Sequence, residues 1–244
     1  MKVPFNIEFS LKRSIRAIAT AVCAVVLTSG AAFAQDGAGE TESKLMVGFK
    51  SGFNLADMRT ATDVGYFTEN GGNGKNFAPQ IHVFGRYNFT KWVGAELELG
   101  WVQNAFTTFT NTETTYRTNN FQANALVNVR IPVLSVYHPR FYIGPSYNYN
   151  AYVYSRQTGS AYGYNFDQTF EVTNDFSPHD FGVIVGTGLQ FDVKFATLLL
   201  DARYRHGLSK AIRTRGNSVN SVAPLSNASG ISDVAFMVGL GFSL

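Results

Sequence analysis

The chain has 244 residues, of which 20 are basic and 17 acidic, for a formal net charge of +3. Residues 1–34 carry the whole excess, since they hold four of the basic residues and one of the acidic ones, which leaves 16 of each in residues 35–244. A balanced chain has no basic surface for nucleic acid, so we expect no nucleic-acid partner. The single cysteine, Cys23, lies in the first 34 residues. Its position excludes disulfides and thiolate metal sites from the remainder, and we expect neither metal nor cofactor.

The first 34 residues have the pattern of an export signal. Four basic residues precede an apolar run over residues 17–27, and the small-residue sequence Ala-Phe-Ala ends at Ala34. We predict cleavage between Ala34 and Gln35. The alternative, an uncleaved membrane helix, needs a longer run to cross about 30 Å of hydrocarbon. The remaining residues, 35–244, suit one domain.

Eight segments beyond the signal alternate apolar and polar residues, which is the pattern of β-strands with one apolar face. The clearest runs from Asn120 to Val133, where every odd-numbered residue is apolar. In chain order the predicted strands span residues 45–55, 78–87, 93–102, 120–133, 141–149, 181–191, 198–205 and 234–244.

The connections between these strands alternate between long and short. Long loops are predicted at about residues 56–77, 103–118, 154–178 and 209–230, and short turns near residues 88–91, 138–139 and 194. An even-stranded barrel gives this order when its short turns and both termini lie in the periplasm and its long loops are extracellular. We therefore predict an all-β fold, an eight-stranded antiparallel up-and-down transmembrane β-barrel in a bacterial outer membrane.

A soluble barrel of the lipocalin type shows the same alternation, so the content of the two faces must decide between them. The polar face gathers glycines with charged residues of both signs, a mixture that fills a narrow lumen. Aromatic residues stand near the predicted strand ends, as membrane-interface girdles do; examples are Tyr87, Trp101, Phe141 and Phe242. A soluble barrel would expose its apolar face as one large patch, which favours the membrane protein.

Several short motifs support this prediction by their order. They are Gly48–Leu55 (GFKSGFNL), Ile131–Leu134 (IPVL), Phe141–Pro145 (FYIGP), Phe181–Leu189 (FGVIVGTGL) and Val238–Phe242 (VGLGF). In this order the motifs resemble the PorT-like outer-membrane β-barrel family over nearly all of residues 35–244. The resemblance implies a surface barrel, linked in some members to protein secretion, and supplies no catalytic residues. Such barrels commonly end in an aromatic residue that the assembly machinery recognises, whereas this chain ends in Phe-Ser-Leu.

Charged residues of both signs fall on the inward face of the predicted strands. In a lumen of low dielectric such charges must pair or stay hydrated, so we expect a network of ion pairs that plugs the barrel. Its expected members are Lys50, Arg86, Glu96, Glu98, Arg130, Asp201 and Arg203. The alternative is a narrow gate that rearranges to pass ions, because eight strands leave no wide channel.

Two further groups lie at or beyond the rim. His179 and Asp180 could activate water or a nucleophile in a lipid acyltransferase or protease, but no serine or second acidic pair accompanies them at a telling spacing, and we expect no enzyme. The third long loop interleaves aromatic with amide side chains, which suits sugar or peptide binding. Its candidate binding residues are Tyr152, Tyr154, Tyr162, Tyr164 and Phe166. The alternative is that the strands flanking this loop extend beyond the membrane.

These observations predict a monomeric outer-membrane barrel whose loops carry a structural, surface-binding or secretion-associated role. Its expected partners are outer-membrane lipid, the barrel-assembly machinery, and a secretion component or an extracellular ligand. We assign no residue a catalytic role.

Overall fold

The computed structural model describes residues 44–60, 74–109, 113–131, 137–161, 164–193, 195–211 and 228–244. The export signal, its cleavage site at Ala34 and Gln35, and Tyr162 lie outside these residues. The strands are β1 (Leu45–Thr60), β2 (Gly74–Asn88), β3 (Val93–Phe109), β4 (Glu113–Arg130), β5 (Tyr137–Ala161), β6 (Tyr164–Glu171), β7 (His179–Val193), β8 (Ala196–Gly207) and β9 (Ala228–Ser243). A short 3-10 helix, η1 (Thr173–Asp175), lies between β6 and β7.

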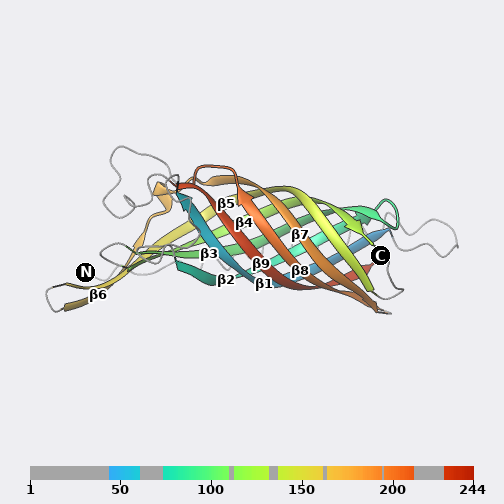
Figure 1. Cartoon of the computed structure of the whole chain (residues 1–244), viewed down its shortest axis with the longest axis horizontal. Helices are drawn as coiled ribbons and strands as arrows, with labels where there is room; N and C mark the ends of the chain where they lie inside the picture. The colour runs from blue at the N-terminus through green and yellow to red at the C-terminus, as the bar shows by residue number, and fades with distance from the viewer. Residues whose placement is uncertain are drawn as a thin grey trace, which may run out of the picture. The chain divides into compact units, whose positions relative to one another are not determined.

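Eight of the described strands form a closed antiparallel ring. The sheet order is β4-β3-β2-β1-β9-β8-β7-β5, and β4 also pairs with β5, which joins the two ends. In Figure 1 the first strand, β1 (blue), lies against the last, β9 (red), from Met46 opposite Ser243 to Thr60 opposite Ala228. β6 stands outside the ring, paired with β5. The predicted eight-stranded antiparallel barrel is confirmed.

Alternation along the strands gives the wall an inner and an outer face. On β7, Ile184 is fully buried, whereas Phe181 and Val185 are exposed on the other face. β4 alternates in the same way, but it ends at Arg130 rather than at the predicted residue 133. The directions of the side chains are therefore those that the sequence pattern predicts, within the strands.

The outer face carries a belt of exposed apolar side chains. They include Phe49, Ile81, Leu97, Leu99, Val127, Val129, Ile143, Val185 and Val238. Leu97 is 65 % exposed, which is unfavourable in water and suits the hydrocarbon of a bilayer. Within the described residues, no helix is long and apolar enough to span a membrane.

The two ends of the barrel differ. The turn end carries the β2–β3 and β7–β8 connections, the start of β1 and the end of β9. Aromatic side chains gather there, and the rings of Tyr87 and Phe89 meet edge to face with their centroids 5.4 Å apart. At the extension end the β3–β4 and β5–β6 ladders continue as paired strands.

Strands at the extension end are longer than the sequence pattern predicts. The second loop, expected over residues 103–118, is mostly strand, because β3 continues to Phe109 and β4 begins at Glu113. The third, expected over residues 154–178, holds the end of β5, all of β6, and η1. Both predictions were wrong because Thr, Tyr and Phe, which are frequent here, favour paired strands even where the segment is polar. In the third loop, the end of β5 and β6 form a paired hairpin.

The interior of the extension end holds an apolar cluster among buried polar side chains. Its buried cluster, the extension-end cluster, consists of Ala56, Phe106, Tyr116, Val153, Val172, Phe176, Ala211 and Ile231. The rings of Phe106 and Tyr116 stack with centroids 5.4 Å apart, and the Phe176 ring lies 6.2 Å from that of Tyr116. Burial raises the pKa of the Tyr116 phenol to about 12. Because Val172 and Phe176 belong to the β6–β7 connection, this connection is anchored in the barrel interior.

Candidate functional site

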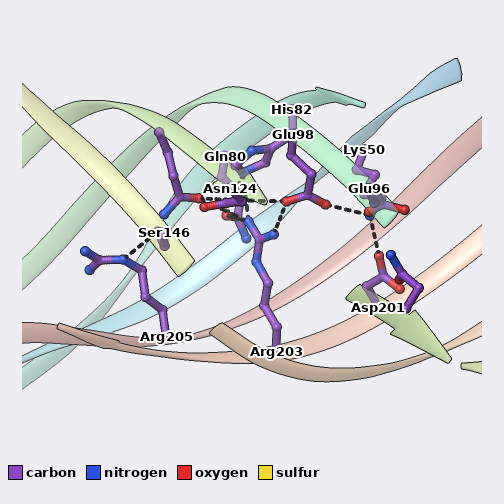
Figure 2. Close-up of polar contacts among 12 residues, drawn as sticks. Lys50, Gln80, His82, Glu96, Glu98, Asn124, Ser146, Asp201, Arg203 and Arg205 are labelled. Carbon is purple, nitrogen blue, oxygen red and sulfur yellow. Dashed lines mark hydrogen bonds and ion pairs between the residues drawn. The ribbon is translucent and has the colours of Figure 1, made fainter. Parts of the chain in front are cut away.

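The buried charges lie inside the barrel (Figure 2). Lys50 of β1 reaches the two glutamates of β3: its Nζ contacts Glu96 and lies 2.6 Å from Oε1 of Glu98. The same Nζ lies 3.2 Å from Oδ2 of Asp201 on β8. One ammonium group therefore joins carboxylates from strands on both sides of β1.

Three arginines surround these carboxylates. Arg86 of β2 lies 2.6 Å from Glu96, and Arg203 of β8 lies 2.7 Å from Glu98. Arg140 of β5 contacts the aspartate of β8 and lies 3.2 Å from Glu96. Each carboxylate thus accepts hydrogen bonds or ion pairs from more than one cation, which compensates its loss of water.

Neutral polar side chains complete the contacts around Arg203. Its Nη2 donates to Oε1 of Gln80 at 3.1 Å and lies 2.9 Å from Nε2 of His82. Asn124 of β4 donates to Glu98 at 2.8 Å. His82 is therefore a hydrogen-bonded residue of the lumen, as expected for a lone inward histidine.

A second group of charges lies closer to the extension end. Arg205 of β8 is 2.5 Å from Oδ2 of Asp180 and 3.9 Å from Asp233, and its Nε donates to Ser146 at 3.1 Å. Among the described residues the buried charged side chains are Lys50, Arg86, Arg140, Arg203, Arg205, Glu96, Glu98, Asp180, Asp201 and Asp233. These five cations and five carboxylates, each 5 % exposed or less, form the lumen charge network. Equal numbers of opposite charges make their burial possible.

Aromatic rings and glycines let the network pack closely. The Nζ of Lys50 lies 4.9 Å from the centroid of the Phe84 ring, and the guanidinium carbon of Arg140 lies 5.1 Å from that of Tyr142. A side chain at Gly186 would collide with the Tyr142 ring, so the wall needs glycine at this close approach. The arrangement is that of an ion-paired core.

Six of the seven predicted lumen residues come together in this network, and Arg130 does not. Arg130 ends β4, is half-buried, and donates its Nε to the carbonyl oxygen of Lys91 at the turn end, at 3.2 Å. It stands opposite Arg140 in the β4–β5 ladder, but its place at the end of β4 keeps it outside the buried network. Arg140 is a cation of the network that the sequence analysis missed. It has the inward parity of β5, but His138-Pro139 resembled a turn, so the predicted strand began at residue 141.

The two candidate catalytic residues at the rim face opposite sides of the wall. His179 is exposed, and its Nδ1 lies 2.7 Å from Oη of Tyr147. Asp180 is buried against Arg205. Consecutive residues on a strand point apart, so this pair cannot act on one substrate. No group of three or more His, Cys, Asp or Glu is placed to hold a metal ion in the part of the chain that the structure describes.

The predicted loop-binding residues lie on or beside the β5–β6 hairpin. Tyr152 is 41 % exposed, and Tyr154 and Phe166 are half-buried. The side chain of Tyr164 lies outside the described residues, as does Tyr162. Phe170 of β6, 42 % exposed, lies opposite Ser155 and shares the other face of the hairpin with Phe166. Phe170 was not predicted because its segment was treated as loop and only the residues before it were considered.

One exposed ion pair crosses the hairpin. Arg156 of β5 lies 2.5 Å from Oδ2 of Asp167 on β6, and both side chains are more than half exposed. A hydrogen bond from Arg156 lowers the pKa of the Asp167 carboxyl. In water such a pair adds little stability.

The sequence itself matches a known family over the same barrel. Residues 33–213 match the model described as "outer membrane protein beta-barrel domain". The chain belongs to this family. The bacterial outer membrane is therefore its location, and the exposed apolar belt is its lipid-facing surface. No curated protein matches the chain.

Solved outer-membrane barrels are similar to this chain at low sequence identity. Neisserial surface protein A is 12 % identical, with 83 % of this chain and 98 % of that chain covered and a TM-score of 0.46. OprG from Pseudomonas aeruginosa is 13 % identical, with 82 % and 95 % covered and a TM-score of 0.44. The attachment invasion locus protein of Yersinia pestis is 12 % identical, with 81 % and 97 % covered and a TM-score of 0.39.

Proposed function

We propose that this outer-membrane barrel is a cell-surface recognition protein that contacts an extracellular ligand through the hairpin of β5 and β6. The observation that carries the proposal is the length of β5. It has 25 residues, whereas a strand needs about 9–11 residues to cross a bilayer. The surplus continues into the hairpin, outside the closed ring (Figure 1).

In this proposal the extension end faces outside, and the turn end with both termini faces the periplasm. Outer-membrane barrels have short periplasmic turns and longer external segments, which supports this orientation. The ion-paired lumen supports recognition over transport, because ions would have to displace buried partners to pass.

The hairpin has the chemistry of a binding surface. Tyr152 exposes a large ring on one face of the hairpin, where Asn165 offers an amide group nearer the tip, and Phe170 exposes a ring on the other face, where Gln168 offers an amide group. Aromatic rings stack on sugars and pack on peptides with little loss of rotamer freedom. Strand pairing along the hairpin holds these groups in place before a ligand arrives.

Site-specific crosslinking in intact cells tests this function. A photoreactive amino acid at position 152 or 170 should form adducts with molecules outside the cell, identified by mass spectrometry. The same probe in place of Arg130, at the turn end, serves as the matched control and should form none of these adducts. If neither hairpin position gives an external adduct, the recognition role is wrong.

The secretion-associated role implied by the PorT-like resemblance predicts a different result from the same cells. In that case the adducts would be periplasmic or outer-membrane secretion proteins, and the Arg130 position would also give them.

Shortening the hairpin gives an independent check. Replacing residues 158–167 by Asn-Gly keeps the Gln157–Gln168 pair next to a two-residue turn. This variant should keep the heat-modifiable gel shift of a folded barrel and lose the external adducts.

A further inference from the structure

β6 lies at the open edge of the sheet. Within the described residues it pairs with β5 alone, from Tyr154 opposite Glu171 to Ala161 opposite Tyr164. Every other described strand has a strand on each side. An edge of this kind presents backbone N–H and C=O groups that can pair with another strand.

The phase of the β5–β6 ladder tells which backbone groups face this edge. The amide of Val172 donates to the carbonyl oxygen of Val153 at 2.9 Å, immediately after the ladder. In an antiparallel pair, hydrogen-bonded residue pairs alternate with non-bonded ones. Bonded pairs recur at every second residue before Val172. The backbone groups of Phe170, Gln168 and Phe166 therefore bond to β5. The N–H and C=O groups of residues 165, 167, 169 and 171 therefore point to the open edge.

We infer that the β6 strands of two copies of this protein pair edge to edge, antiparallel, with Gln168 opposite Gln168. The inference rests on the proposed function, since it names the ligand of the same hairpin. In this register the four edge-facing residues meet one another: Asn165 stands opposite Glu171, and Asp167 opposite Thr169. The two cross-strand aromatic pairs that result, each a Phe166 opposite a Phe170, add stability and cover the exposed ring of Phe170.

Electrostatic repulsion selects this register over its neighbours. A shift in one direction places Asp167 opposite Asp167, and a shift in the other places Asp167 opposite Glu171 twice. Like charges directly opposite each other destabilise a sheet. A shift by one residue would place the backbone groups that face the open edge opposite groups that already bond to β5, so no ladder could form. The sequence of β6 is thus better matched to itself in this antiparallel register than in the neighbouring ones.

Antiparallel pairing also fixes how the two barrels face each other. β5 continues from the barrel wall into the hairpin, and β6 runs back alongside it (Figure 1). Two antiparallel β6 strands therefore hold their barrels on opposite sides of the contact. With the hairpins outside the cell, the contact joins two facing membranes, and the partner is the same protein on another cell.

Disulfide crosslinking of folded protein in detergent tests the register. The sequence has one cysteine, Cys23, in the predicted export signal, so unsubstituted protein is the background control. In the Gln168→Cys variant the two thiols face each other as a non-bonded pair, with Cα atoms about 4.5 Å apart. A disulfide spans this distance, so mild oxidation should shift the protein from monomer to dimer on a non-reducing gel.

The Phe166→Cys variant is the matched control on the same face of β6. Its counterpart in the second copy lies four residues along the strand, about 13 Å away at about 3.3 Å per residue. Alone it should stay monomeric, and mixed with Phe170→Cys protein it should form dimers. Equal dimer yields from Phe166→Cys alone and Gln168→Cys would mean random collision and overturn the register.

A proline at position 169 separates the edge contact from the hairpin fold. The N–H of Thr169 points to the open edge, so Thr169→Pro removes a bond to the second copy and none to β5. Combined with Gln168→Cys it should lose the crosslinked dimer. Vesicles carrying the unsubstituted protein should cluster, and those carrying Thr169→Pro should not. If Gln168→Cys stays monomeric while position 170 still forms adducts with foreign molecules, the recognition role stands and self-pairing is overturned.

Discussion

Lys50 sets how much negative charge the lumen can hold, because its ammonium is within 3.2 Å of three carboxylates. Glu96 and Asp201 share Arg140, whereas Arg86 pairs with Glu96 and Arg203 with Glu98. A group that bridges three anions contributes more than one isolated ion pair would. Its removal leaves negative charge that the barrel cannot hydrate.

The Lys50→Met variant should therefore lose about 3–5 kcal/mol of the free energy of unfolding, the range for breaking a buried ion pair. Urea titration of protein in detergent, followed by the gel shift between folded and unfolded forms, measures the loss. The control is Arg130→Met, which removes a cation outside the network and should change stability by about 0.5 kcal/mol or less. Equal losses in both variants would contradict a special role of Lys50.

Within a strand, the sequence predicts which face a side chain occupies better than it predicts where the strand begins and ends. The alternation along β1 and β3 correctly predicted Lys50, Glu96 and Glu98 as lumen residues, because a two-residue period is a local property of the strand. Strand ends are not local: Arg130 falls outside the network and Arg140 was not predicted, because both depend on where β4 stops and β5 starts. Which inward charges meet depends on register between strands that are far apart in sequence. No local pattern carries that register.

The β6–β7 connection makes the hairpin part of the folded barrel. Val172 and Phe176 sit in the extension-end cluster, and the amide of Ser177 donates to the carbonyl oxygen of Ala211 at 2.9 Å. The sequence analysis placed this segment in a loop, because η1 and its neighbours lack alternation. Packing against residues from other strands, rather than local periodicity, orders it.

We expect Phe176→Ala to loosen this connection, because an aromatic ring that is 1 % exposed leaves a cavity. Protease added to intact cells should then cut the variant near residues 172–178 faster than it cuts the unsubstituted protein. Phe170→Ala, which trims an exposed ring of the hairpin, should leave the cutting rate unchanged. Mass spectrometry of the fragments locates the cut. Unchanged resistance in Phe176→Ala would show that the ring does not anchor the segment.

For the molecule as a whole, the lumen has apolar clusters on both sides of its charges. Met46, Phe84 and Leu199 form one toward the turn end, and the extension-end cluster forms the other. A conducting path would have to cross both clusters as well as the ion pairs. The closed ring and its filled interior favour a barrel that interacts through its surface outside the lipid rather than through its lumen.

Planar-bilayer recordings check this closed state. We expect no single-channel steps from purified protein at neutral pH. A variant with both Glu96→Ala and Glu98→Ala should also be silent, because the apolar clusters remain even when the freed cations draw in water. The unsubstituted protein in the same bilayers, added at rising amounts, controls for insertion artefacts. Reproducible steps in the double variant alone would favour the narrow gate that the sequence left open.

The lumen charge network also constrains how the barrel is assembled. Lys50 on β1 meets Asp201 on β8, and Arg140 on β5 meets Glu96 on β3, so charges from early strands also pair with charges from late ones. A half-formed sheet would leave these contacts unmade, which lipid disfavours. When β9 pairs with β1, the two sets of charges come together. Ring closure is therefore the step that completes the network, and insertion should be cooperative, with no stable open sheet on the way.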